Sequence, residues 1–91
     1  MSKPYTEHKV SKSVAIRTFS VNADWSELRW HWDEEDRLVE PLNDNDWQFQ
    51  FDNELPQKIY RKIIIPRNVM HRVIPGTTDL IIKIVKNNGT P

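Results

Sequence analysis

Three side chains of this sequence could together hold a metal ion: His31, Asp33 and His71. His31 and Asp33 lie two residues apart in ELRWHWD (27–33), where polar and apolar residues alternate as in a β-strand. Such side chains leave the same face of a strand, about 6–7 Å apart. His71 lies in a later predicted strand, VMHRVI (69–74). If the two strands are neighbours, two imidazoles and one carboxylate can converge, which is the composition of a facial triad for Fe²⁺ and would also suit Mn²⁺, Ni²⁺ or Zn²⁺.

The same residues also allow a pocket without metal. His31 could be half-buried and hydrogen-bonded to Glu27 or Asp33 instead of binding an ion. Arg37 would bring a cation near the site and weaken metal binding, and its guanidinium could instead clamp Asp33 or a carboxylate of a substrate. Two hypotheses therefore stay open: a divalent metal centre with Fe, Mn, Ni or Zn, or a vestigial, metal-free pocket.

Four more polar side chains are candidates for lining a small-molecule pocket beside this group. They are Arg29, Arg37, Gln48 and Gln50. Either glutamine could offer an amide oxygen as an additional, weak metal ligand. The residue types do not identify a catalytic residue or a substrate.

The segments that must position these side chains are predicted to be strands joined by turns. Turn-forming residues recur about every 9–12 residues, a spacing typical of a β-sandwich or a small barrel. The turn sequences are DEED (33–36), NDND (43–46), DNELPQ (52–57), PRN (66–68) and PGTT (75–78). Because no stretch shows a sustained period of 3.6 residues, the sequence predicts an all-β domain.

Alternation also predicts which side chains face the core. The segment 27–33 places Leu28, Trp30 and Trp32 on one face, and WQFQFD (47–52) does the same with Trp47, Phe49 and Phe51. We expect both aromatic faces, together with Trp25, to lie in the core. The polar faces then meet solvent or line a cavity. The first expected strand, SVAIRTFSV (13–21), has Ala15, Arg17 and Phe19 opposite Val14, Ile16 and Thr18.

Two stretches read together resemble a compact member of the cupin superfamily. They are LRWHWDEEDRLVEPLNDNDWQFQF (28–51) and IIIPRNVMHRVIPGTTDLIIKI (63–84). In this resemblance His31 and Asp33 carry the first motif, and Pro66, Asn68 and His71 carry the second. The resemblance implies a double-stranded β-helix, or jelly-roll, barrel. It also implies that an enzymatic activity would be a metal-dependent oxidation or isomerisation.

The sequence departs from the cupin pattern at several positions. Asp33 stands where a second histidine is usual, and Arg37 stands where a glutamate would fall, unless Glu35 or Asp36 takes that place. The usual turn glycines are replaced by Asn43 or Asn45 in the first motif and by Asn68 in the second. Asparagine tolerates positive φ better than other non-glycine residues, so these turns can survive the replacement.

Length and composition limit the class of protein. A chain of 91 residues has room for one domain, spanning 1–91, with expected flexible ends at 1–12 and 87–91. Without cysteine, it cannot form disulfides or thiolate metal sites. The longest aliphatic run, Ile63–Ile65, is too short for a membrane span, and the amino terminus lacks the apolar core of a signal peptide. We therefore predict a cytoplasmic protein without a membrane partner.

Charge bears on the expected partners. Thirteen basic residues balance thirteen acidic ones, which argues against binding a nucleic acid by bulk electrostatics. The acids are concentrated in 24–54 and the bases in 58–86, so the two groups could pair within one chain or between two copies. A homodimer is expected, and the alternative to a ligand-binding cupin is a non-catalytic interaction module. In that module strand 13–21 would add to a neighbour's sheet.

Overall fold

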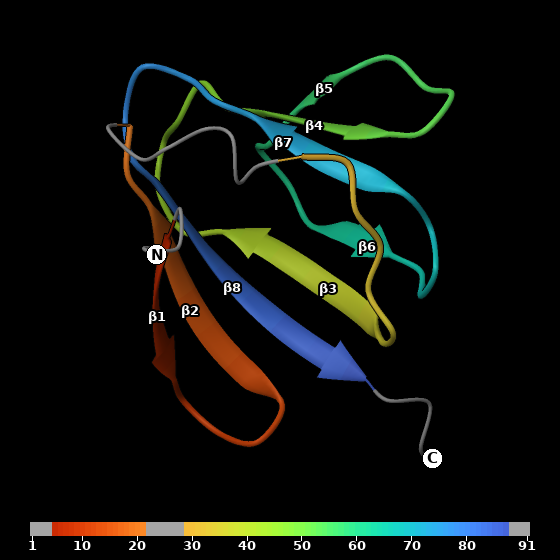
Figure 1. Ribbon diagram of the computed structural model, residues 1–91. Helices are drawn as coiled ribbons and strands as arrows, with labels where there is room; N and C mark the ends of the chain where they lie inside the picture. The colour runs from red at the N-terminus through yellow and green to blue at the C-terminus, as the bar shows by residue number, and fades with distance from the viewer. Residues whose placement is uncertain (1–4, 22–28, 88–91) are drawn as a thin grey trace.

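The computed structural model describes residues 5–21 and 29–87 of the chain. Within these residues, eight strands form two antiparallel sheets, and Figure 1 shows the smaller sheet lying over the larger one. No helix occurs in the described residues, and the all-β prediction is confirmed.

The larger sheet has five strands. They are β1 (Tyr5–Lys9), β2 (Val14–Phe19), β8 (Leu80–Asn87), β3 (Asp36–Pro41) and β6 (Ile63–Ile65), and they lie side by side in that order. β8 is the central strand, with β2 on one side and β3 on the other. The long carboxy-terminal strand therefore joins the amino-terminal hairpin to the middle of the chain.

The smaller sheet has three strands. They are β5 (Gln57–Lys58), β4 (Gln48–Phe51) and β7 (His71–Ile74), again in spatial order. In the β4–β7 pair, Phe51 lies opposite His71 and Phe49 lies opposite Val73. His71 is therefore held at the beginning of β7, next to the aromatic side chains of β4.

The core lies between the two sheets. Its buried members are Phe19, Val39, Trp47, Phe49, Ile59, Ile63, Ile65, Leu80, Ile82 and Ile84. Trp47 is fully buried, and its indole N–H donates a hydrogen bond to the carbonyl of Thr78, which satisfies the polar end of a side chain that is otherwise apolar. Trp47, Phe49 and Phe51 thus pack inward from one face of the chain, as their alternation predicts.

Asparagines shape two of the turns. Asn68 and Asn53 are the non-glycine residues with positive φ in the described part of the chain, at 62° and 65°. The prediction for Asn68 is confirmed, whereas Asn43 and Asn45 do not adopt positive φ. The side-chain carbonyl of Asn43 instead accepts a hydrogen bond from the backbone N–H of Ile81, at 2.9 Å.

Gly76 allows two turns to pack closely. A Cβ at this position would overlap the backbone and the carboxylate of Asp46. That carboxylate accepts hydrogen bonds from the backbone N–H of Thr77, at 2.8 Å, and from the Thr77 hydroxyl. The PGTT turn before β8 is therefore fastened to the NDND turn before β4.

The expectation of a strand over 27–33 needs correction. Residues 27 and 28, like Trp25, lie outside the described residues. Residues 29–33 form one isolated β-bridge, between His31 and His71. Trp30 and Trp32 are 38% and 52% exposed and do not lie in the core. The alternation is present, but the face with His31 and Asp33 turns toward the site and the aromatic face turns to solvent.

The expected roles of the amino-terminal strands also change. The strand predicted over 13–21 is not an edge strand, because β2 pairs with β1 as well as with β8. Tyr5–Lys9, expected in a flexible end, forms the edge strand β1, and Asn87 closes β8. No helix among the described residues is long and apolar enough to cross a membrane.

Candidate metal centre

The backbone places His31 and His71 opposite each other. The N–H of His31 donates to the carbonyl of His71 at 3.0 Å, and the N–H of His71 donates to the carbonyl of His31 at 2.8 Å. Two antiparallel residues that exchange both hydrogen bonds project their side chains to the same face. The isolated bridge is therefore the reason that the two imidazoles meet.

Asp33 is brought to the same place by the turn before β7. The backbone N–H of Asn68, the residue with positive φ, donates to the carbonyl of Asp33 at 2.8 Å. The segment 31–33 is thus fixed at both of its ends to the chain around β7. This double attachment sets the position of the carboxylate relative to the imidazoles.

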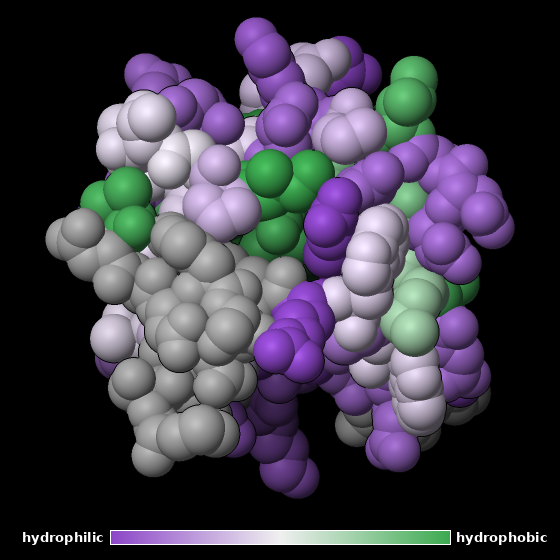
Figure 2. Space-filling view, turned by 45° about the horizontal axis from the view of Figure 1, so that its top comes forward, coloured by the Kyte–Doolittle hydropathy of each residue, from purple (hydrophilic) through white to green (hydrophobic). Residues whose placement is uncertain are grey.

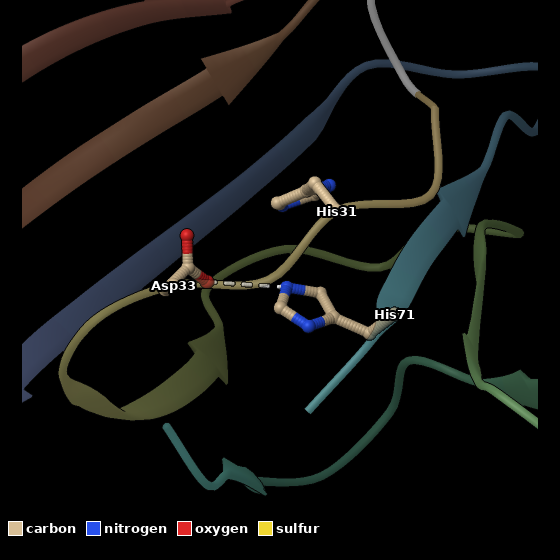
Figure 3. A group of neighbouring side chains, drawn as sticks. All are labelled: His31, Asp33 and His71. Atoms are coloured by element: carbon tan, nitrogen blue, oxygen red, sulfur yellow. Dashed lines mark ion pairs between the residues drawn. The ribbon is translucent and has the colours of Figure 1, made fainter. Parts of the chain in front are cut away.

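Figure 3 shows the side chains of His31, Asp33 and His71 converging. One potential ligand atom of each lies within 4.8 Å of the other two. The imidazole ring centroids are 4.4 Å apart, and Nε2 of His71 lies 3.3 Å from Oδ2 of Asp33. The convergence expected from the sequence is confirmed.

The two histidines differ in their exposure to solvent. His71 is buried, and its ring stacks on that of Phe49 with 5.5 Å between centroids. His31 is exposed. The group therefore lies at the boundary between the core and solvent, and the His31 side is open to an incoming ion.

Backbone carbonyls determine which nitrogen of each imidazole is available. Nδ1 of His31 lies 2.8 Å from the carbonyl oxygen of Arg29, and Nδ1 of His71 lies 2.9 Å from that of Val69. A carbonyl oxygen only accepts hydrogen bonds, so each Nδ1 carries a proton. In the neutral rings Nε2 then has a free lone pair. Metal-binding histidines usually have their second nitrogen held in this way.

Arg37 holds one oxygen of Asp33. Its Nη2 lies 3.4 Å from Oδ1 of Asp33 and 2.7 Å from Oε1 of Glu35. The other oxygen of Asp33, Oδ2, is buried and has no hydrogen-bond donor among the described residues. Burial raises the pKa of this carboxyl, whereas the contact with His71 and the charges of Arg37 and the two histidines lower it by more. The pKa of Asp33 is therefore below its usual value, and the group is in the ionised form that a metal requires.

This set of donor atoms fits a divalent cation. Oδ2 of Asp33 and Nε2 of His71 face each other at 3.3 Å, as an ion pair when His71 is protonated and as two acceptors when it is neutral. Two acceptors at that distance in a buried place need a proton or a metal ion between them. A cation bound by Nε2 of His31, Nε2 of His71 and Oδ2 of Asp33 would satisfy all three atoms.

The two alternative carboxylates have other partners. Glu35 accepts a hydrogen bond from Nε of Arg37 at 2.8 Å. Asp36 accepts one from the backbone N–H of Arg67 at 2.8 Å, and this bond lowers the pKa of Asp36. Glu35 therefore positions Arg37, and Asp36 anchors the turn between β6 and β7.

A cavity of about 90 Å³ adjoins the group and extends between the sheets. Its polar lining includes His31, His71, Arg37 and Arg17, and most of the remaining lining is aliphatic or aromatic. At about 30 Å³ per water molecule, this volume holds about three waters. The cavity therefore has room for a ligand of a few non-hydrogen atoms.

Of the four residues expected to line a pocket, Arg37 does so. Arg29, Gln48 and Gln50 are not among the described residues that line this cavity. The side chain of Gln50 accepts a hydrogen bond from Arg72 at 2.9 Å and donates one to the carbonyl of Glu54. Gln50 is taken up by this network and is not aimed at the metal centre.

Arg17 is a cavity residue that the sequence-based site did not include. It lies on β2 between the buried Ala15 and Phe19, on the inward face. The sequence feature that could have identified Arg17 is the alternation of 13–21, in which this one charged residue shares a face with the apolar Ala15 and Phe19.

Comparisons with known proteins concern the fold. No family model and no curated protein matches the chain. Among solved structures, a cupin domain from Bordetella pertussis Tohama I has a TM-score of 0.59 and 19% identity, covering 96% of this chain and 98% of that one. The DMSP lyase DddQ from Ruegeria pomeroyi DSS-3 has a TM-score of 0.72 and 9% identity, covering 97% and 49%. A structure of FeII HppE has a TM-score of 0.61 and 11% identity, covering 91% and 48%.

The chain therefore has the cupin fold, with two facing antiparallel sheets and a His–Asp–His group beside the cavity between them. The resemblance noted in the sequence is confirmed at the level of the fold. The chain is similar over its length to the cupin domain of Bordetella pertussis, and it spans about half the length of the lyase and of HppE.

Proposed function

We propose that this protein binds one divalent metal ion through His31, Asp33 and His71 and presents it to a small ligand in the adjoining cavity. The observation that carries the proposal is the convergence of three atoms with lone pairs, none of which accepts a hydrogen bond from a described residue. Oδ2 of Asp33 is buried and accepts no hydrogen bond from these residues, and each Nδ1 lies against a backbone carbonyl, which leaves Nε2 of each ring as the available ligand atom. A proton between His71 and Asp33 would satisfy two of these atoms, whereas a metal ion would satisfy all three.

The surrounding residues have supporting roles in this proposal. Arg37 orients the Asp33 carboxylate, and Phe49 covers one face of the His71 ring and excludes water from it. A bound divalent ion would supply a Lewis acid, or a redox-active centre in the case of Fe²⁺, as metal-assisted isomerisation or oxidation requires. One structural neighbour, HppE, is described with FeII, and this supports Fe²⁺ as a candidate beside Mn²⁺, Ni²⁺ and Zn²⁺.

Isothermal titration of the metal-free protein with each of the four ions tests this proposal. We expect one ion per chain for at least one metal, and loss of binding in the His31→Ala/His71→Ala double variant. His8→Ala is the matched control, because His8 lies on β1, away from the group, and is exposed. Unchanged binding in the double variant, or no binding of any of the four ions by the parent protein, would contradict the proposal.

A second candidate function, self-association, is supported by an apolar row on the outer face of the larger sheet. Val14 pairs with Val85, Val85 with Leu38, and Leu38 with Ile64, so the row crosses β2, β8, β3 and β6. Ile64 is 71% exposed and lies on the edge strand β6. On the face in Figure 2, by contrast, hydrophobic side chains form separate small patches between hydrophilic ones.

We propose that the occupant of this outer face is a second copy of the chain. Beside the apolar row, Glu40 and Lys83 are cross-strand partners, so a two-fold arrangement can place the glutamate of one copy against the lysine of the other. Sedimentation of Ile64→Glu should then show a lower dimer fraction than the parent protein. Leu55→Glu is the control, since Leu55 is 86% exposed and lies outside the row. A monomeric parent protein would refute this candidate.

A further inference from the structure

We infer that the cavity takes a small carboxylate anion and that Arg17 binds its carboxylate group. The inference rests on the proposed function, because the metal ion is placed at the same cavity, and it names the chemical class of the ligand. It starts from a cation on the inward face of β2 that the metal centre does not use.

Arg17 is held in the wall of the cavity by two contacts from β1. Its Nε donates a hydrogen bond to Oε1 of Glu7 at 2.6 Å, and its guanidinium carbon lies 4.2 Å from the centre of the Tyr5 ring. Glu7 and Arg17 are cross-strand partners, so the register of the β1–β2 hairpin fixes this pairing. The side chain of Arg17 is 12% exposed. A positively charged group this buried needs anionic or hydrogen-bonding partners.

The unused part of this guanidinium is the part that recognises carboxylates. Nε is occupied by Glu7, and no described residue accepts a hydrogen bond from either Nη of Arg17. The two Nη groups present parallel N–H donors, which match the two oxygens of a carboxylate in a bidentate pair. Arg17 lines the same cavity of about 90 Å³ as His31 and His71, so a ligand bound to the guanidinium would lie in the cavity that adjoins the metal centre.

The charges around the cavity favour an anion. The charged side chains in its lining are Arg17 and Arg37. Ion pairs with Glu7 and Glu35 outside the lining offset their charges, so these arginines chiefly offer N–H donors to a ligand. A divalent ion bound by the single carboxylate of Asp33 would add a net positive charge. The resulting positive electrostatic potential would attract an anion more strongly than a neutral ligand.

Size limits the ligand further. Pockets for drug-sized molecules usually have volumes of about 300–1,000 Å³, and the volume here is about 90 Å³. A monocarboxylate of two to four carbons is therefore the expected class. Propionate and its neutral isostere propionamide are suitable probes, because they have the same number of non-hydrogen atoms and differ in charge.

The test is a titration of the full chain, loaded with Zn²⁺, with propionate and with propionamide. Dissociation constants are read from ¹H–¹⁵N chemical shifts, including the Nε–Hε signal of Arg17. We expect propionate to bind more tightly than propionamide by about tenfold to a hundredfold, the usual contribution of hydrogen bonds to a charged group. Arg17→Met should remove this preference and leave the Zn²⁺ affinity unchanged. Arg61→Met is the control, because Arg61 is exposed and hydrogen-bonds the hydroxyl of Tyr60.

Further outcomes separate this inference from the proposed function. If Arg17→Met keeps the preference for propionate, the metal alone selects the anion and the inference is overturned. If the parent protein binds no metal, the proposed function fails, and the same titration without metal tests the inference. A shift of the Arg17 Nε–Hε signal with propionate but not with propionamide supports the inference. Equal shifts with the two ligands overturn it. Arg17→Lys covers the case that Arg17→Met does not fold. Lysine keeps the positive charge but lacks the two parallel N–H donors of the guanidinium. A propionate affinity equal to that of the parent protein would therefore overturn the bidentate contact.

Discussion

Replacing Asp33 by asparagine should separate metal binding from the stability of the metal-free protein. The substitution keeps the shape of the side chain and leaves an oxygen near Nη2 of Arg37, which lies 3.4 Å from Oδ1 of Asp33. The new Nδ2–H₂ group takes the place of Oδ2, which has no donor and faces Nε2 of His71 at 3.3 Å. When His71 is neutral, this amide can donate to the Nε2 lone pair.

The size of the effect follows from these contacts. A new neutral hydrogen bond contributes about 0.5–1.5 kcal/mol, and removing an unsatisfied buried acceptor adds to it. Weakening the ionic contact with Arg37 offsets part of this gain, while Arg37 keeps its ion pair with Glu35. We therefore expect the free energy of unfolding of metal-free Asp33→Asn to equal that of the parent or to exceed it by about 1 kcal/mol, which raises Tm by about 4–8 °C for a domain of this size.

In the presence of metal, the parent protein should be more stable than Asp33→Asn. An ion present at a hundred times its Kd stabilises the folded parent protein by about 2.7 kcal/mol, or about 11–22 °C in Tm. Asp33→Asn should gain little, because it has lost the anionic ligand. The assay is thermal unfolding with and without the ion, and Glu35→Gln is the control, since Glu35 contacts Arg37 without being a candidate ligand. A metal-free Asp33→Asn that is destabilised by more than about 1 kcal/mol, or one that gains as much from metal as the parent, would refute the reasoning.

Three further predictions concern the turns that hold the site. Asn68→Gly should be tolerated and Asn68→Val should lower stability by about 1–2 kcal/mol in denaturant unfolding, because φ is 62° at this position. Gly76→Ala should cost about 1–3 kcal/mol by the same measurement, since the added Cβ overlaps Asp46; an unchanged midpoint would contradict the close packing. Hydrogen bonds from the Thr77 hydroxyl and backbone N–H lower the pKa of Asp46, so its contribution to stability is present above the unfolded pKa and is lost as pH falls through the folded value. Asp46→Asn should therefore flatten the dependence of stability on pH below about 4, as an acid titration followed by circular dichroism would show.

The sequence contained enough information for the class of fold and for the three candidate ligands. Trp47, Phe49 and Phe51 alternate with polar residues over a length that suits a strand with one buried face, and they pack inward in the structure. His31, Asp33 and His71 were identified by residue type, by the two-residue spacing of the first pair and by the resemblance to cupins, and they converge. The inward face of β4 and the shared face of His31 and Asp33 follow from local periodicity, which can be read from the sequence.

The orientation of the segment before β3 could not be predicted from the alternation. A two-residue period fixes that Trp30 and Trp32 share a face opposite His31, but both assignments of the inward face satisfy it. The tryptophans are the larger apolar groups, so burial of that face was the natural expectation, and it was wrong. The pairing of His31 with His71, a contact between residues 40 positions apart, decides the orientation.

The order of residues by itself determined that this chain forms strands and turns, and which side chains share a face. Only the tertiary structure decided that Arg17 and not Gln50 lines the cavity, and that Oδ2 of Asp33 is left without a donor. The physical reason is that periodicity is a property of neighbouring residues. Burial and hydrogen-bond satisfaction, by contrast, depend on which distant strands pair and in which register.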